Sequence, residues 1–283
     1  MTGDFGNDHA ALKAACVPGT ALCTIVGIEG SYSRRLGAQL AVGRDGRFAG
    51  SLADGCLEHQ LASDVRDLRA PETRRYGQGS KTIDFRLPCG SGLDILLDPT
   101  PDSDACQTAV AALESRAEVS IPLPDLARLS RRAYLPSPAL RIFGEGPELS
   151  ALESIAKAAG FDVQSFGKDS IGPDRNPITD MADRWTANIL LFHDHEWEDA
   201  ILSHALDSAS FFIGAQGGSN ARKQRVEKLK SVGIPTSQID RIRSPVGAIA
   251  SNRTPQSLAL SILAEVAADY ENLLDEAICA FAA

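Results

Sequence analysis

Two cysteines lie beside glycines in settings that could present a reactive thiol. Cys56 follows Gly55 at the start of a helical pattern, and Cys89 precedes Gly90 in a glycine-rich turn over 88–92. A thiol at a helix N-terminus ionises more readily than a free one, and a thiolate is a ligand for soft metals. Free cysteine is more commonly a small buried hydrophobic residue. The pattern therefore makes Cys56 and Cys89 candidate ligands, with a structural role as the alternative.

The stretch 27–58 contains Cys56, several glycines and the adjacent pair Arg34 and Arg35. Glycine allows a ligand to approach the backbone closely, and arginine binds anions. Residues 54–68 carry apolar side chains at helical spacing, and we expect Asp54 to be the N-cap of this helix. The stretch 27–58 is thus predicted to form half of a ligand site.

The bulk properties exclude several classes of protein. The chain has 283 residues, 43% of them hydrophobic, and a net charge of −9. This charge argues against nucleic acid as the main partner, because phosphate binding needs a basic face. We find no signal peptide and no apolar run long enough to span a membrane. The six cysteines are widely spaced, without a CxxC pair, so we expect a cytoplasmic protein with reduced thiols.

The first half of the chain predicts an α+β domain. The dipeptide Asp45-Gly46 between two short apolar runs is a hairpin signal. The predicted elements are a helix over 8–15, strands over 21–27, 39–43, 47–49, 82–87 and 93–98, and the helix that contains Cys56.

A proline-rich segment separates this domain from the rest of the chain. Prolines stand at 122, 124, 136 and 138, and proline is unsuited to helix interiors and central strands. We therefore predict an N-terminal cysteine-bearing domain over 1–130, a linker over 131–139 and a C-terminal domain over 140–283.

The C-terminal domain begins with a strand, a glycine turn at Gly144 and Gly146, a helix and a second strand. This βαβ pattern predicts a Rossmann-like parallel sheet, with further strands over 188–192 and 211–214. The dinucleotide fingerprint is damaged, because Pro147 lacks an N–H group and because Glu145 and Glu148 are negative where phosphates would lie. Lys168 stands near the position of the acid that binds a ribose. We therefore expect the fold without NAD(P).

Two further loops could bind a ligand. His193 and His195 stand two residues apart at a strand end, beside carboxylates. Such a pair could bind a metal, but residues in this position more commonly face solvent or cap the next helix. The loop after the next strand contains Gly214, Gly217 and Ser219, and its helix carries Arg222, Lys223 and Arg225. Backbone donors and cations converge there, which predicts an anion site, with a solvated basic helix face as the alternative. Thr254 and Pro255 then begin a long helix to about residue 281.

The order and spacing of these motifs resemble the xanthine dehydrogenase accessory protein family (XdhC/CoxI) over nearly the whole chain. The matching pieces in the first domain include Gly30-Ser31, Gly55-Cys56-Leu57-Glu58 and Cys89-Gly90. Those in the second domain include Gly144-x-Gly146, His193-Asp194-His195 and Pro245-Val246-Gly247. The chain departs from the family pattern at Asp54 and Ser91, where glycine is usual, and at Pro147, where histidine is usual.

The resemblance implies a molybdenum cofactor chaperone, and it favours a non-enzymatic accessory role over an enzymatic one. Members of that family bind the cofactor, protect it while a cysteine desulfurase supplies a terminal sulfur, and help load it into a molybdenum hydroxylase of the xanthine dehydrogenase type. For this chain the implied molybdenum ligands are Cys56 and Cys89, and a homodimer is an assembly to be considered. Two alternatives remain at this stage: an NAD(P)-dependent oxidoreductase that uses the Rossmann domain, and a degenerate scaffold that docks a hydroxylase without binding cofactor.

Overall fold

A computed structural model describes residues 7–52, 55–80, 90–125, 128–170, 180–193 and 197–280. The chain divides into two compact units, each described by itself. The first unit comprises Gly6–Pro136 with Leu274–Ala283, and the second comprises Met1–Phe5 with Ser137–Leu273.

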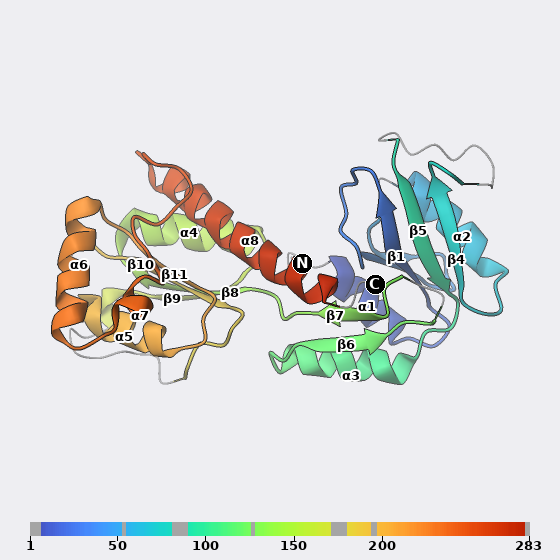
Figure 1. The fold of residues 1–283 in the computed structure, drawn as a ribbon, viewed down its shortest axis with the longest axis horizontal. Helices are drawn as coiled ribbons and strands as arrows, with labels where there is room; N and C mark the ends of the chain where they lie inside the picture. Colours follow the sequence, from blue (N-terminus) through green and yellow to red (C-terminus); the bar gives the residue numbers. More distant parts are fainter. Residues whose placement is uncertain are drawn as a thin grey trace. The chain divides into compact units, whose positions relative to one another are not determined.

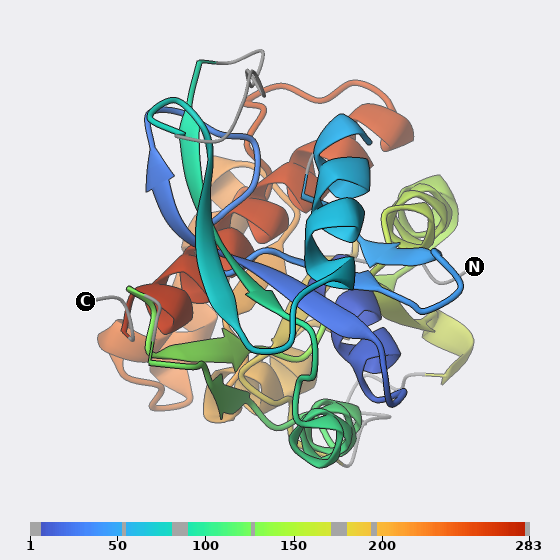
Figure 2. The ribbon, with the colours of Figure 1, turned by 90° about the vertical axis from the view of Figure 1, so that its right-hand side faces the viewer.

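The first unit is built on a five-stranded antiparallel sheet with the order β3-β2-β1-β5-β4 (Figures 1 and 2). Its strands are β1 (Ala21–Glu29), β2 (Gln39–Val42), β3 (Phe48–Gly50), β4 (Glu72–Gly77) and β5 (Gly92–Asp98). A separate hairpin pairs β6 (Val119–Pro122) with β7 (Arg131–Tyr134). The helices are α1 (Asn7–Ala15), α2 (Cys56–Arg66) and α3 (Ser103–Glu114).

Side chains of β1 point alternately to two apolar layers, as the period of a strand requires. Cys23 and Ile25 pack with Leu57 and Leu61 of α2, whereas Leu22 packs in a cluster formed by α1 and α3. Helices therefore cover both faces of this sheet, which explains why β1 is an almost continuous apolar run.

The second unit is a five-stranded parallel sheet with the order β12-β11-β10-β8-β9 (Figure 1). Its strands are β8 (Ala139–Gly144), β9 (Asp162–Phe166), β10 (Thr186–Leu191), β11 (Phe212–Ala215) and β12 (Ile242–Arg243). The helices are α4 (Gly146–Ala158), the short 3-10 helix η1 (Lys168–Ser170), α5 (Asp199–Asp207), α6 (Ser219–Ser231), α7 (Thr236–Ile239) and α8 (Pro255–Cys279). The predicted Rossmann-like parallel sheet is confirmed.

Two apolar layers sandwich this parallel sheet. Helices α4 and α8 pack on one face through residues such as Leu152 and Ile262. Helices α5, α6 and α7 pack on the other face through Leu202, Leu229 and Ile239. Thr254 caps α8 as expected, because its Oγ1 accepts the N–H of Ser257 at 3.1 Å. None of the described helices combines the length and the apolar content that a membrane crossing needs.

The structure differs from several details of the expected element pattern. Strand β7 falls within the segment 131–139 that was predicted as a linker, because side chains at 132–134 are buried despite the nearby prolines. The last residues of α8, from Leu274 onward, belong to the first unit. Strand β4 and helix α3 were missed, and the predicted strand over 82–87 lies outside the described residues.

Candidate functional site

Three loops leave the sheet of the first unit at the same end. Strand β1 ends at Glu29, which is paired with Gly92 at the start of β5. The last residue of β3, Gly50, is paired with Leu40 near the start of β2. Because the strands are antiparallel, the β1–β2 loop, the segment from β3 to α2 and the residues before β5 emerge together. These are the segments that contain Arg34, Cys56 and Gly90.

Hydrogen bonds join two of these loops directly. The hydroxyl of Tyr32 donates to the carbonyl of Leu52 at 2.6 Å. The guanidinium of Arg34 donates to the carbonyl and the Oγ of Ser51, both at 3.3 Å. A Cβ added at Gly30 would lie 3.6 Å from Ser91, so the segment before β5 lies close to the β1–β2 loop. The structure thus brings together the predicted half-site in 27–58 and the neighbours of Gly90.

Helix α2 begins at Cys56, whose side chain is exposed. The N-cap is Gly55, with φ of 104°, and not the expected Asp54, which lies outside the described residues. The capping role falls to the buried Glu58 from within the first turn. Its carboxylate accepts the N–H groups of Gly55 at 2.8 Å and of Leu52 at 3.0 Å. Only glycine adopts this positive φ without strain, so the Gly55-Cys56-Leu57-Glu58 sequence has a local structural reason.

Two of the predicted glycines have no close neighbour among the described residues. A Cβ added at Gly55 or at Gly90 would meet no heavy atom of the described residues within 4 Å, and both glycines have positive φ. A ligand can therefore approach the backbone beside the exposed Cys56 thiol without a steric barrier from these residues. Cys89 itself lies outside the described residues.

Three of the other described cysteines, Cys16, Cys23 and Cys106, differ from Cys56 in burial. Burial raises the pKa of Cys23 to about 12, with a further contribution from the charges of Asp64 and Asp98. Burial also raises the pKa of Cys106 to about 11 and that of the half-buried Cys16 above its ordinary value. Cys279, near the end of α8, is exposed like Cys56.

Arg35 forms a surface ion pair, with its Nη1 3.1 Å from Asp275. The side chains are 25% and 64% exposed, and such pairs contribute about 0–1 kcal/mol. The ion pair itself therefore contributes little to holding Arg35 in place, whereas Arg34 donates two hydrogen bonds to Ser51.

The glycine turn of the second unit has a charge arrangement opposite to that of a dinucleotide site. Glu145 pairs with Lys168 at 2.7 Å, and Pro147 occupies the first turn of α4. His193 lies 3.8 Å from Glu148, and His195 is outside the described residues. Within the described parts of the chain, no three histidine, cysteine or acidic residues gather as a metal site would require.

Two of the predicted glycines here are required by packing. A Cβ at Gly144 would lie 2.8 Å from Leu191 Cβ, and one at Gly214 would lie 2.5 Å from Val246 Cγ2. Gly146 and Gly217 instead have φ of 75° and 117°, as their turns demand. Gly144 and Gly214 therefore shape the sheet, while Gly146 and Gly217 shape the loops at its carboxyl end.

The predicted convergence of cations at α6 is wrong for Arg225. This side chain is buried and forms a bidentate pair with the buried Glu198, at 2.8 and 3.1 Å. The same guanidinium also donates to Ser244 Oγ at 2.7 Å, so its polar contacts lie in the interior. Arg222 remains exposed and donates to the Ser244 carbonyl at 3.2 Å, and it lies in the first turn of α6, which begins at Ser219. The anion site expected at this loop therefore has fewer available cations than the sequence indicated.

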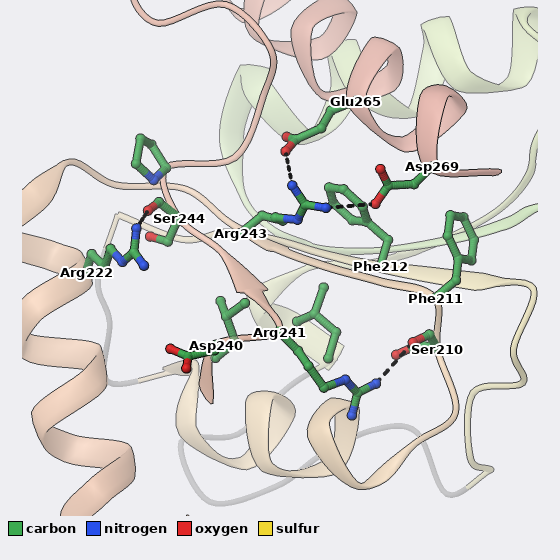
Figure 3. A pocket seen from close by; sticks show the side chains of 13 residues that line it. Ser210, Phe211, Phe212, Arg222, Asp240, Arg241, Arg243, Ser244, Glu265 and Asp269 are labelled. Atoms are coloured by element: carbon green, nitrogen blue, oxygen red, sulfur yellow. Dashed lines mark hydrogen bonds and ion pairs between the residues drawn. The ribbon is translucent and has the colours of Figure 1, made fainter. Parts of the chain in front are cut away.

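A cavity of about 590 Å³ lies beside the edge strand β12 (Figure 3). Sequence analysis missed it because its lining comes from separate elements, although Arg222 was a predicted site residue. Arg243 contacts Asp269 at 3.1 Å and Glu265 at 3.6 Å. Arg241 donates to three backbone carbonyls at the end of α5. Arg241 and Arg243 thus already interact with protein oxygens, which disfavours an anion site beside β12.

Comparison with known proteins gives matches in both units. Residues 19–77 match the model of the XdhC and CoxI family, and residues 140–266 match that of the XdhC Rossmann domain. The chain is 32% identical to a protein of Escherichia coli K12 named molybdenum cofactor insertion chaperone PaoD, over 88% of this chain and 83% of the relative.

Two other known proteins match over almost the full length. A protein of Bacillus subtilis 168, named as a probable xanthine dehydrogenase subunit, is 24% identical over 93% of this chain and 97% of its own. A crystal structure from Bacillus halodurans, described as a xanthine dehydrogenase, superposes with a TM-score of 0.72 and 20% identity. It covers 95% of this chain and 96% of the other, and it supports the fold.

Proposed function

Because this chain belongs to the XdhC and CoxI family, we propose that it is an accessory protein that binds a molybdenum cofactor and delivers it to a molybdenum hydroxylase. The observation that carries this proposal is the similarity to the insertion chaperone PaoD along most of both chains. A hydroxylase of the xanthine dehydrogenase type is the proposed recipient. The role is that of a chaperone, with the cofactor as cargo.

The chemistry of the first unit supports cofactor binding at Cys56. Molybdenum accepts soft sulfur donors, and Cys56 presents an exposed thiol at the start of α2. The open space that the described residues leave at Gly55 and Gly90 gives room for a flat ligand beside this thiol. We propose Cys56 as a molybdenum ligand, Cys89 as the second, and Arg34 and Arg35 as the nearby cations.

The second unit offers a separate candidate for a phosphate. The backbone of α6 begins after Gly217 and Gly218, and no acidic residue lies in its first turn. Helix N-termini of this kind bind anions, and the exposed Arg222 adds a cation. We propose this loop, with Ser219, as an anion-binding element, and Gly144, Gly146 and Gly214 as the residues that shape this end of the sheet.

The remaining proposals rest on the family. A cysteine desulfurase is the proposed source of the terminal sulfur of the cofactor, the cytoplasm is the proposed location and a homodimer is the proposed assembly. The proposed role of Cys56 does not depend on the desulfurase, the location or the assembly.

The experiment measures molybdenum and pterin in the purified protein. We expect both to co-purify with the wild-type chain from cells that synthesise the cofactor, and Cys56→Ala to lose most of them. Cys279→Ala is the matched control, because it removes another exposed thiol. A combined Cys56→Ala and Cys89→Ala variant tests the second proposed ligand.

Stoichiometric cofactor in the combined variant would contradict a thiol-based site. If the wild-type chain purified without cofactor but captured a hydroxylase, and did so without both thiols, the scaffold alternative would replace our proposal. Retention by Cys279→Ala and loss by Cys56→Ala is the result that we expect.

A further inference from the structure

The carboxylate of Glu58 is buried next to Cys56, although charged groups seldom lie in the interior. The residue is only 5% exposed. Burial of a charge costs free energy unless hydrogen bonds compensate it. Here each oxygen accepts a backbone N–H group, Oε1 from Leu52 at 3.0 Å and Oε2 from Gly55 at 2.8 Å. The carboxylate is therefore an integral part of the loop before α2.

This position is one that a bound anion occupies in many proteins. The first N–H groups of a helix have no partner within the helix, and phosphate groups commonly bind them. In this chain Glu58 supplies the negative charge and takes up the N–H group of the N-cap residue, Gly55. An incoming phosphate would meet a fixed like charge and one donor fewer.

Side chains of the β1–β2 loop also hold the segment before α2. Tyr32 donates to the Leu52 carbonyl at 2.6 Å, and Arg34 donates to Ser51. Leu52 therefore has both its N–H and its carbonyl engaged, by Glu58 and by Tyr32 respectively. These bonds oppose a rearrangement that would free the amides for an anion.

We infer that Glu58 is a specificity-determining residue, which takes the place of a bound anion at the start of α2 and excludes phosphate from the Cys56 site. The site then accepts a ligand through the thiol and not through a phosphate group. Resting on the proposed function, this means that the molybdenum end of the cofactor meets Cys56 and that its phosphate binds elsewhere.

The test follows alkylation of Cys56 by iodoacetamide, read by mass spectrometry, as inorganic phosphate is added at constant ionic strength. The alkylation rate of Cys56 in the wild-type protein is expected to be unchanged by phosphate. In Glu58→Gln, which removes the charge, phosphate is expected to slow the alkylation of Cys56 by about tenfold at a concentration that leaves the wild-type rate unchanged, since a like charge at close range is gone. Cys279 in the same sample is the internal control.

Glu58→Asp separates charge from shape. It keeps the negative charge but is one methylene shorter, so Cys56 in this variant is expected to stay insensitive to phosphate. If Glu58→Gln folds only when phosphate or acetate is present, that rescue also supports the inference, because an anion has replaced the carboxylate.

Three results would overturn the inference: phosphate protection of Cys56 in the wild type, a folded Glu58→Gln variant that ignores phosphate, or a Glu58→Gln variant that no anion rescues. None of these measurements involves molybdenum. A Cys56→Ala protein that keeps its cofactor would overturn the proposed function and leave the role of Glu58 intact, so the two failures are distinguishable.

Discussion

At the scale of single residues, burial divides the described cysteines into three that are buried or half-buried and two that are exposed. Cys23 lies in the core between β1 and α2, whereas Cys56 and Cys279 are exposed. Sequence pattern singled out Cys56 through its glycine and its helix, and the structure agrees with that exposure. It could not show how strongly Cys23 is shielded, because this depends on strands that are distant in sequence.

The buried thiol of Cys23 predicts a loss of stability at alkaline pH. Its pKa is about 12 in the folded protein, against about 8.5 in an unfolded chain. The stabilisation from this thiol is complete below the unfolded pKa and is lost as pH rises through the folded pKa, by about 1.4 kcal/mol per pH unit. The free energy of unfolding, measured with urea between about pH 9 and 10.5, should decline less steeply with pH for Cys23→Ala than for the wild type.

Cys279→Ala provides the control for this measurement, because Cys279 is exposed. Its stability should decline with pH as steeply as that of the wild type. An identical slope for Cys23→Ala and Cys279→Ala would contradict the assigned burial.

The buried pair of Arg225 and Glu198 is the residue-scale feature that sequence analysis misread. Both side chains are almost completely inaccessible, at 3% and 1% exposure. Arg225 was grouped with exposed cations because a helix sequence does not say which of its polar residues faces inward. The helix has few apolar residues, so the usual amphipathic signal was weak.

Arg225→Met is expected to lower the free energy of unfolding by about 3–5 kcal/mol, since it leaves a buried carboxylate without its partner. Denaturant unfolding of Arg225→Met and of the double variant Arg225→Met, Glu198→Met measures this. The double variant should be more stable than the single one, because no uncompensated charge remains. A single variant within about 1 kcal/mol of wild type would be incompatible with the pair as described.

At the scale of elements, the turn between β8 and α4 explains why a Rossmann sheet need not bind a dinucleotide. Glu145 and Glu148 stand at the start of α4, and Lys168 neutralises the former. Calorimetric titration with millimolar NADH or NADPH should therefore give no binding heat. Saturable heat with either nucleotide would restore the oxidoreductase alternative.

Close packing between β11 and its neighbours predicts the effect of Gly214→Ala. The added methyl group would lie 2.5 Å from Val246 and 2.8 Å from Phe212, and overpacking of this kind costs about 1–3 kcal/mol. Gly167→Ala is the control, because its Cβ would meet only the Gly144 carbonyl, at 4.0 Å. Thermal unfolding of both variants measures the difference, and an equal shift in the two would contradict this account.

Element prediction succeeded where the local signal matched the tertiary environment. Strand β1 and the hairpin of β2 and β3 have apolar runs and an Asp-Gly turn, and both are confirmed. Strand β4, with the sequence Glu-Thr-Arg-Arg-Tyr-Gly, was missed because it is a polar edge strand whose pairing with β5 supplies its stability. The N-cap of α2 is Gly55 and not the predicted Asp54, and the N–H group of Gly55 donates to Glu58 within the first turn.

At the scale of the whole molecule, the order of motifs carried more information than any single one. The predicted fold class is confirmed by the parallel sheet and by the match of residues 140–266 to the XdhC Rossmann domain. The assembly of the candidate site from residues near 30, 55 and 90 could not be predicted from spacing. It depends on the antiparallel register of β1, β2, β3 and β5, which brings separate loops to one end of the sheet.

Transfer of molybdenum is the measurement that tests the central claim most directly. The loaded wild-type protein is mixed with a molybdenum hydroxylase that lacks its cofactor, the two are separated, and molybdenum is quantified in each. We predict that molybdenum appears in the hydroxylase together with its activity, and that protein prepared as Cys56→Ala transfers none while Cys279→Ala transfers as wild type. Molybdenum that stays with the loaded chain, or equal transfer from Cys56→Ala, would contradict the account.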